Sequence, residues 1–156
     1  FKSKSYEGGI STPLIVHWPD GIKKETSEMT SAPGYLIDIM PTLLEVAGAT
    51  YPKEYAGEWI HPLEGKSLIP VFETGTRVPA NFMFWEHESE GAVRHGDWKA
   101  MFLEHSNTWE LYNLANDRTE QHDLAAKQPQ ILDVLKQAWN DWAVTHEVYP
   151  RGRTTY

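Results

Sequence analysis

The apolar positions in the first third of the chain predict one strand and one helix. Residues 14–16 (Leu-Ile-Val) are apolar in succession and end before a Pro-Asp-Gly turn at 19–21. A strand that is apolar on successive residues is covered on both faces, as in the parallel sheets of α/β proteins. Between 35 and 48 the apolar residues recur every three or four positions, which predicts a helix that begins near Pro41 and ends at Gly48.

The second half of the chain has the pattern of several short strands followed by one helix. Strand-like segments, joined by short polar turns, lie at 81–87, 92–94, 98–103 and 109–114. Strands that follow one another through short connections predict an antiparallel meander. From Pro129 onward the apolar positions take helical spacing, which predicts an amphipathic helix that packs across the meander.

Residues 51–80 separate these two regions. This stretch is rich in proline and glycine without regular spacing, which is typical of a long ordered connection at a subdomain boundary. We therefore expect an α/β fold in three parts. They are the end of an α/β domain at 1–50, a connecting segment at 51–80, and a C-terminal antiparallel subdomain with a packed helix at 81–156.

The composition argues against several classes of function. The 156 residues carry 14 Lys and Arg against 22 Asp and Glu, and the formal net charge of −8 argues against a nucleic-acid or anionic-membrane surface. No cysteine is present, which excludes disulfides and thiolate metal sites. No apolar run is long enough for a membrane span. Because the chain begins with Phe1 inside a motif, we expect a fragment whose N-terminal part is missing.

The chain opens with a cationic lead and a glycine pair, Lys-Ser-Lys-Ser-Tyr-Glu-Gly-Gly at 2–9. This segment resembles the sulfatase family of the alkaline phosphatase superfamily, in which a lysine, a few small residues and Tyr-Glu-Gly-Gly lead into a strand that ends in Trp-Pro. The resemblance implies that Lys2, four residues before Tyr6, is a catalytic residue that binds the sulfate group. An ammonium group beside that developing charge stabilises the transition state strongly in a dry site. The family often has an arginine where this chain has Ser11, so a role of that arginine does not carry over.

Further motifs follow in the family's order along nearly the whole chain. They are Asp-x-x-Pro-Thr-Leu-Leu at 38–44, Gly-x-Ser-Leu at 65–68, Leu-Tyr-Asn-Leu at 111–114 and Asp-Leu-Ala at 123–125. The run Trp-Glu-His-Glu at 85–88 resembles a Glu-His-Glu-Gly pattern of a bacterial sulfatase subgroup. That resemblance implies that His87 belongs to the substrate pocket. Residues 89–91 (Ser-Glu-Gly) depart from the more frequent Gly-Asn-Arg.

The seven histidines do not predict a metal site, because no two of them have the i, i+4 spacing of a helical zinc site. Sulfatases use a formylglycine, made within a Cys/Ser-x-Pro-x-Arg motif, and a divalent metal, usually calcium, held by Asp and Asn side chains. That formylglycine motif does not occur in this sequence. We therefore expect formylglycine and calcium upstream of Lys2 in the intact enzyme, no metal ligand in this chain, and no turnover by the fragment alone.

The resemblance implies the C-terminal portion of an arylsulfatase-like sulfuric ester hydrolase. The resemblance also implies a sulfated small molecule or a sulfated glycan as the substrate. The residues themselves do not indicate a location, and only the resemblance suggests a periplasmic or secreted one. A phosphodiester or phosphonate hydrolase of the same superfamily is one alternative, because tetrahedral anions of both elements suit the same cationic site. A non-catalytic glycan- or protein-binding module is another, and it predicts that Trp85, Trp98 and Trp109 are exposed in one line.

Overall fold

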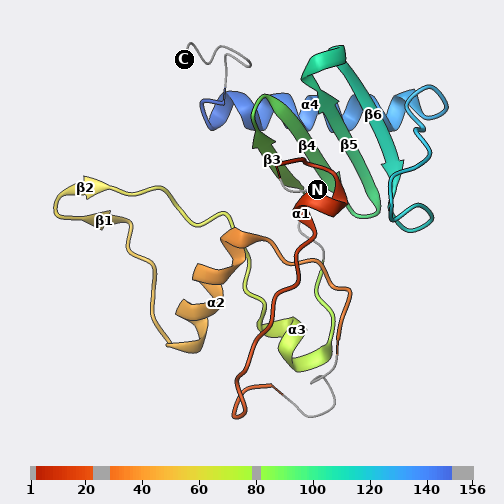
Figure 1. Ribbon diagram of the computed structural model, residues 1–156. Coiled ribbons are helices and arrows are strands. Elements are labelled where there is room, and N and C mark those ends of the chain that lie inside the picture. The colour runs from red at the N-terminus through yellow and green to blue at the C-terminus, as the bar shows by residue number, and fades with distance from the viewer. Residues whose placement is uncertain (1–2, 23–28, 79–81, 149–156) are drawn as a thin grey trace. The chain divides into compact units, whose positions relative to one another are not determined.

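The computed structural model describes residues 3–22, 29–78 and 82–148, and the chain divides into two compact units (Figure 1). The first unit combines residues 1–13 with residues 80–156, and the second unit is residues 14–79. Among the described residues, the first unit therefore joins 3–13 with 82–148 in one compact body.

An antiparallel sheet of four strands forms the centre of the first unit (Figure 1). The strands pair in the order of the sequence and are β3 (Met83–His87), β4 (Glu90–His95), β5 (Trp98–Leu103) and β6 (Thr108–Asn113). This order confirms the predicted meander. Two-residue turns join the first three strands, because His87 pairs with Glu90 and His95 pairs with Trp98.

Each of these two turns uses a left-handed backbone conformation. Gly96 has a φ of 59° in the β4–β5 turn, as expected for a glycine in a tight hairpin. In the β3–β4 turn the same region is adopted by Glu88 (φ 49°) and Ser89 (φ 66°), where Asn or Gly is usual. The β3–β4 turn therefore holds two side chains in a strained backbone region.

Helix α4 (Pro129–Thr145) covers one face of the sheet and begins at its proline, as predicted (Figure 1). Its apolar side buries Trp139 completely against the inward residues of the middle strands. This core contains Val93, Ala100, Leu111, Leu135, Trp139 and Ala143. A Cβ on Gly91 would lie 2.8 Å from the indole ring of Trp139, so this strand position accepts only glycine without displacement. Trp142 stacks on Phe84 at 5.0 Å between ring centroids.

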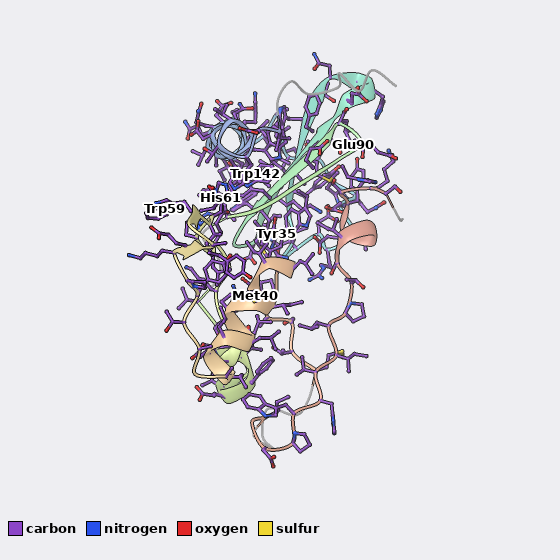
Figure 2. All side chains as sticks on the ribbon, turned by 90° about the vertical axis from the view of Figure 1, so that its left-hand side faces the viewer. Tyr35, Met40, Trp59, His61, Glu90 and Trp142 are labelled. Atoms are coloured by element: carbon purple, nitrogen blue, oxygen red, sulfur yellow. The ribbon has the colours of Figure 1, made fainter. Side chains whose placement is uncertain are left out.

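The opposite face of the sheet is covered by the N-terminal segment, which we define as residues 3–10. This segment contains the short helix α1 (Glu7–Ile10). Ala92, Met101 and Leu103 form a small buried cluster on this face, and Tyr6 and Trp85 pack against it. In Figure 2, Glu90 and α1 lie on the side of the sheet away from α4. Strand β5 is therefore covered on both faces, by α4 and by the N-terminal segment.

The second unit is organised around one buried carboxylate. It contains a 3₁₀ turn η2 (Leu36–Asp38), helix α2 (Ile39–Val46), a short hairpin of β1 (Glu54–Tyr55) and β2 (Glu58–Trp59), and helix α3 (Ile69–Thr74). Asp38 accepts the backbone N–H groups of Tyr35 and Lys66, both at 2.8 Å. Its Oδ2 atom also lies 2.7 Å from Nη1 of Arg77. These contacts join three separate segments of the unit.

The prediction for residues 35–48 is confirmed and the prediction for residues 14–16 is wrong. Pro41 lies in the first turn of α2, and Gly48 follows the helix with a φ of 60°. Residues 14–16 form no strand, and Ile15 is 89% exposed. A strand needs a hydrogen-bonded neighbour, and none of the described segments pairs with these residues. An apolar run alone therefore does not produce a strand here.

No helix within the described ranges is long and apolar enough to cross a membrane.

Candidate functional site

The candidate site begins where the N-terminal segment meets the sheet. Nζ of Lys4 lies 2.5 Å from Oε1 of Glu90 on β4. The hydroxyl of Tyr6 donates to Oε2 of Glu110 on β6 at 2.6 Å. The backbone N–H of Glu7 donates to a third carboxylate at 2.6 Å, the Oε2 atom of Glu120. Three carboxylates from different parts of the chain therefore bind this segment.

A fully buried lysine lies at the centre of these contacts. Nζ of Lys99 is 2.7 Å from Oε1 of Glu120 and 3.3 Å from Oε1 of Glu7, and the lysine side chain is 0% exposed. Nε of Arg118 lies 3.1 Å from Oε2 of Glu7, and its Nη2 donates to Oγ of Ser11 at 2.8 Å. Two cations thus face two carboxylates, which balances the formal charge. We call Glu7, Lys99, Arg118 and Glu120 the buried charge cluster. Three of its members are buried, whereas the side chain of Arg118, at its edge, is 57% exposed.

The loop after β6 brings Glu120 to this cluster. The carboxylate of Asp117 accepts the backbone N–H groups of Gln121, at 2.9 Å, and His122, at 2.8 Å. These hydrogen bonds, that of Gln121 first, hold the pKa of Asp117 below its ordinary value. Glu120 itself has a φ of 56°, a conformation that the closed loop imposes on it. The loop is therefore shaped by Asp117 and presents Glu120 to the sheet.

Two tyrosines share one carboxylate beside the cluster. The hydroxyls of Tyr6 and Tyr112 both donate to Oε2 of Glu110, at 2.6 and 2.7 Å. Burial, followed by the hydrogen bond and the negative charge of Glu110, raises the pKa of both phenols. Both phenols therefore keep the protons that they donate to Glu110 up to a higher pH than an ordinary tyrosine does. Their rings meet edge to face, with the centroids 6.4 Å apart.

The structure describes only one of the two site residues that were predicted from the sequence. Lys2 lies outside the described residues. The other lysine of the lead, Lys4, is engaged with Glu90. His87 ends β3 opposite Glu90, so both side chains leave the sheet on the face that the N-terminal segment covers. The imidazole is 58% exposed, and its Nε2 atom lies 4.0 Å from Oε1 of Glu88.

Sequence reasoning missed Glu7, Lys99 and Glu120 as a group. A signal for them was present in the pattern of residues 98–103. That strand is apolar on both faces except for Lys99, and a lysine in a strand covered on both sides needs a carboxylate partner. Glu7 lies within the motif at 2–9, and Glu120 lies three residues before the motif at 123–125. The sequence does not show which carboxylate reaches the lysine.

A pocket of about 460 Å³ opens beside the buried charge cluster. It is lined by Tyr6, Glu7, Gly8, Tyr112, Arg118, Thr119, Glu120 and Gln121. The ionic groups in its wall are paired with one another, as the distances above show. Within residues 3–22, 29–78 and 82–148, no group of three or more His, Asp or Glu side chains is arranged to hold a metal ion. The described residues therefore do not supply a metal centre.

The chain matches a known family over nearly all of its length. The model of the C-terminal region of N-sulphoglucosamine sulphohydrolase matches residues 2–146. A sulfatase of Formosa agariphila is 34% identical over 150 residues, which cover 85% of this chain and 26% of that protein. Human arylsulfatase A is 30% identical over 168 residues, which cover 87% of this chain and 31% of the human protein. The chain thus spans about a quarter to a third of the length of these relatives.

The same similarity is found among solved structures. The structure of BT4656 in complex with its substrate, D-glucosamine-2-N,6-O-disulfate, aligns with a TM-score of 0.64 at 22% identity. The alignment covers 91% of this chain and 30% of that one, and it confirms the expected α/β class with an antiparallel meander and a C-terminal helix. The family model and the two relatives identify the chain as a member of the sulfatase family, corresponding to the C-terminal domain.

Proposed function

We propose that this chain is the C-terminal part of an enzyme that hydrolyses sulfate esters. In this proposal Lys2 binds the sulfate group and His87 contributes to the rim of the substrate pocket. The observation that carries the proposal is the anchored N-terminal segment. Lys4, Tyr6 and Glu7 are each bound to a carboxylate, so the backbone is fixed two residues after Lys2. The family match includes Lys2.

The role of Lys2 is electrostatic in this proposal. Its ammonium group lies beside the sulfate oxygens, whose charge changes as the ester bond breaks, and a fixed cation stabilises that charge more than mobile water does. Lys4 is the other cation of the lead, but its charge is compensated by Glu90. We therefore assign sulfate binding to Lys2 and a structural role to Lys4.

Sulfatases use a formylglycine as nucleophile and a divalent metal, usually calcium, to stabilise charge. The described residues provide no metal centre. We assign both groups to the remainder of the enzyme, upstream of Lys2. In this proposal residues 1–50 are the end of the catalytic α/β domain, 51–80 a connection and 81–156 the C-terminal subdomain. The compact units of the structure divide the chain differently, because residues 3–13 belong to the same unit as the C-terminal subdomain. A periplasmic or secreted location remains a prediction from the resemblance.

We propose a sulfated sugar as the substrate class. The solved relatives include BT4656 with D-glucosamine-2-N,6-O-disulfate and Ps i-CgsB with k-i-k-neocarrahexaose. In this chain His87 is exposed at the end of an edge strand, on the sheet face that carries the N-terminal segment. The left-handed pair Glu88 and Ser89 follows it directly. A hydrogen bond from the imidazole to a sugar hydroxyl is the contact that we assign to His87.

The alternatives considered from sequence lack support. The similarity is to sulfatases, which favours sulfate esters over phosphodiesters and phosphonates. A glycan-binding line of tryptophans is not formed. Trp98 and Trp109 pack against the core under α4, whereas Trp85 packs on the opposite face of the sheet.

The proposal is tested by exchanging the two lysines of the lead separately in the full-length enzyme. We expect Lys2→Met to lower kcat/KM for an aryl sulfate by roughly 10²- to 10³-fold, the usual effect of removing one group that stabilises transition-state charge. Lys4→Met, the matched control, is expected to lower it less than about tenfold, because Lys4 does not touch the substrate. Equal, small effects of both exchanges in folded enzyme would contradict the assignment of Lys2.

A further inference from the structure

The buried charge cluster is unlike the rest of the core in its chemistry. Lys99 is completely buried, yet Met101 and Leu103 follow it on the same face of β5. Burying an ion pair costs desolvation energy, and apolar replacements of such pairs are often neutral or stabilising. Stability alone therefore does not explain a lysine at this position. What ionic contacts supply, and apolar contacts do not, is a fixed geometry between particular partners.

The cluster fixes both the backbone and the side chain of Glu7. Glu120 uses its two oxygens on different partners, since Oε1 binds Nζ of Lys99 and Oε2 accepts the backbone N–H of Glu7. The carboxylate of Glu7 in turn contacts Lys99 and Arg118. A shift of the N-terminal segment along the sheet would break all of these contacts together. The first turn of α1 is thus held in one register.

This register extends back along the segment as far as Lys4. Tyr6 is bound to Glu110, Ser5 is 2% exposed, and Lys4 is paired with Glu90. Every residue from 4 to 7 is therefore buried or bound to the sheet. Lys4 is two residues from Lys2 in the sequence, so the cluster limits where the lysine of the motif can lie.

We propose that Lys99 is a positioning residue for the sulfate-binding lysine. It acts through Glu7 and Glu120 and holds the N-terminal segment in the register that aims Lys2 at the sulfate group. Lys99 does not touch the substrate in this proposal. The inference rests on the proposed function, since it requires Lys2 to bind sulfate.

The test is a double-mutant cycle in the full-length enzyme with Lys2→Met, Lys99→Met and both together. A misplacement of about 1 Å can cost roughly 10²-fold in rate, so we expect Lys99→Met to lower kcat/KM by about that factor. The double variant is expected to resemble Lys2→Met alone, because a positioning residue has no effect once its target is absent. Inhibition by inorganic sulfate should weaken in the Lys2→Met and Lys99→Met variants, and the double variant should again resemble Lys2→Met alone.

Leu135→Ala is the matched control, because Leu135 is buried on the opposite face of the sheet. It is expected to lower the melting temperature about as much as Lys99→Met does, while kcat/KM and sulfate inhibition of the folded enzyme stay within about twofold of the parent. If Lys99→Met fails to fold, Glu120→Gln replaces it in the cycle, since the amide oxygen still accepts the N–H of Glu7.

The outcomes separate the two proposals. If Lys2→Met has no effect on activity, the proposed function falls and the inference falls with it. If Lys2→Met is inactive but Lys99→Met changes only the melting temperature, the proposed function stands and the positioning role is wrong. Losses that multiply in the double variant would also overturn the positioning role, because they show that Lys99 acts independently of Lys2.

Discussion

The two faces of the four-stranded sheet are both covered, but by different chemistry. Helix α4 covers one face with an apolar side centred on Trp139. The N-terminal segment covers the other through ion pairs and hydrogen bonds centred on Lys99. Apolar burial is non-directional and roughly proportional to area, whereas charged hydrogen bonds require particular partners at set distances. The face under α4, called the helical face below, therefore stabilises the sheet. The face under the N-terminal segment, called the ionic face, specifies where residues 4–7 lie.

The largest expected effect is on the helical face. Trp139→Ala should destabilise the first unit by about 3–5 kcal/mol, the usual cost of deleting a buried aromatic side chain. Trp139 is 0% exposed and its ring contacts Trp109 and Trp142 edge to face. Urea denaturation followed by circular dichroism measures the loss. Val134→Ala is the control and should change stability little, because Val134 of α4 is 62% exposed.

The second effect concerns the stability that is lost when the buried ion pairs of the ionic face are broken. Lys99→Met alone should cost about 3 kcal/mol, the lower end for breaking a buried pair, because Arg118 still compensates one carboxylate. The triple variant Glu7→Gln, Lys99→Met, Glu120→Gln removes the three buried charges together and leaves only Arg118, whose side chain is 57% exposed, so it should recover most of that loss. Denaturant midpoints of the two variants give the comparison.

The activity of the triple variant shows whether the ionic contacts do more than stabilise the fold. Its stability should return to within about 1 kcal/mol of the parent, but its kcat/KM for an aryl sulfate should remain low, because the side chain at position 7 loses its ion pairs with Lys99 and Arg118. Full recovery of both quantities would show that apolar packing positions the N-terminal segment as well as the ion pairs do.

The elements of the helical face could be predicted from the sequence, whereas the ionic face could not. The strand at 98–103 and the helix that begins at Pro129 follow local periodicities, and the structure has both. The cluster joins residues 7, 99 and 120, and no local pattern encodes such distant partners. The strand predicted at residues 14–16 is wrong for a related reason. Whether an apolar run becomes a strand depends on a neighbour that periodicity does not show.

The site itself was only partly predictable. The resemblance of the motif at 2–9 indicated Lys2 as the residue that binds sulfate. The structure describes how the residues after Lys2 are anchored to the sheet. The position of His87 relative to the N-terminal segment depends on the register of β3 and β4, which the turn at Glu88 and Ser89 sets. Neither residue is a usual choice for a left-handed turn, so the sequence did not show this register.

A third, smaller effect tests how closely the helical face is packed. Gly91→Ala places a Cβ 2.8 Å from the indole of Trp139, so the ring or strand β4 must shift. Overpacking of this kind costs about 1–3 kcal/mol. The melting temperature should fall accordingly. The double variant Gly91→Ala, Trp139→Phe offers more room and should lose less than the sum of the single changes, which a double-mutant cycle measures.

The smallest effect concerns the pH dependence of the ionic face. Burial and Glu110 raise the pKa of Tyr6 and Tyr112 in the folded chain, whereas phenols of the unfolded chain ionise near pH ~10. Below that pH both states keep their protons and the contribution of the pair is complete. Above it the unfolded chain releases protons that the folded chain retains, so the free energy of unfolding falls as the pH rises.

The test compares melting temperatures from about pH 8 to 11 for the parent and for the variant Tyr6→Phe, Tyr112→Phe. The variant lacks both phenols, so its melting temperature should fall less steeply over the alkaline part of this range. Tyr55→Phe is the control. Tyr55 is 76% exposed on the β1–β2 hairpin, and its removal should leave the parent slope unchanged. Equal slopes for all three proteins would mean that folding does not raise the pKa of Tyr6 and Tyr112, which would contradict the burial of their hydroxyls beside Glu110.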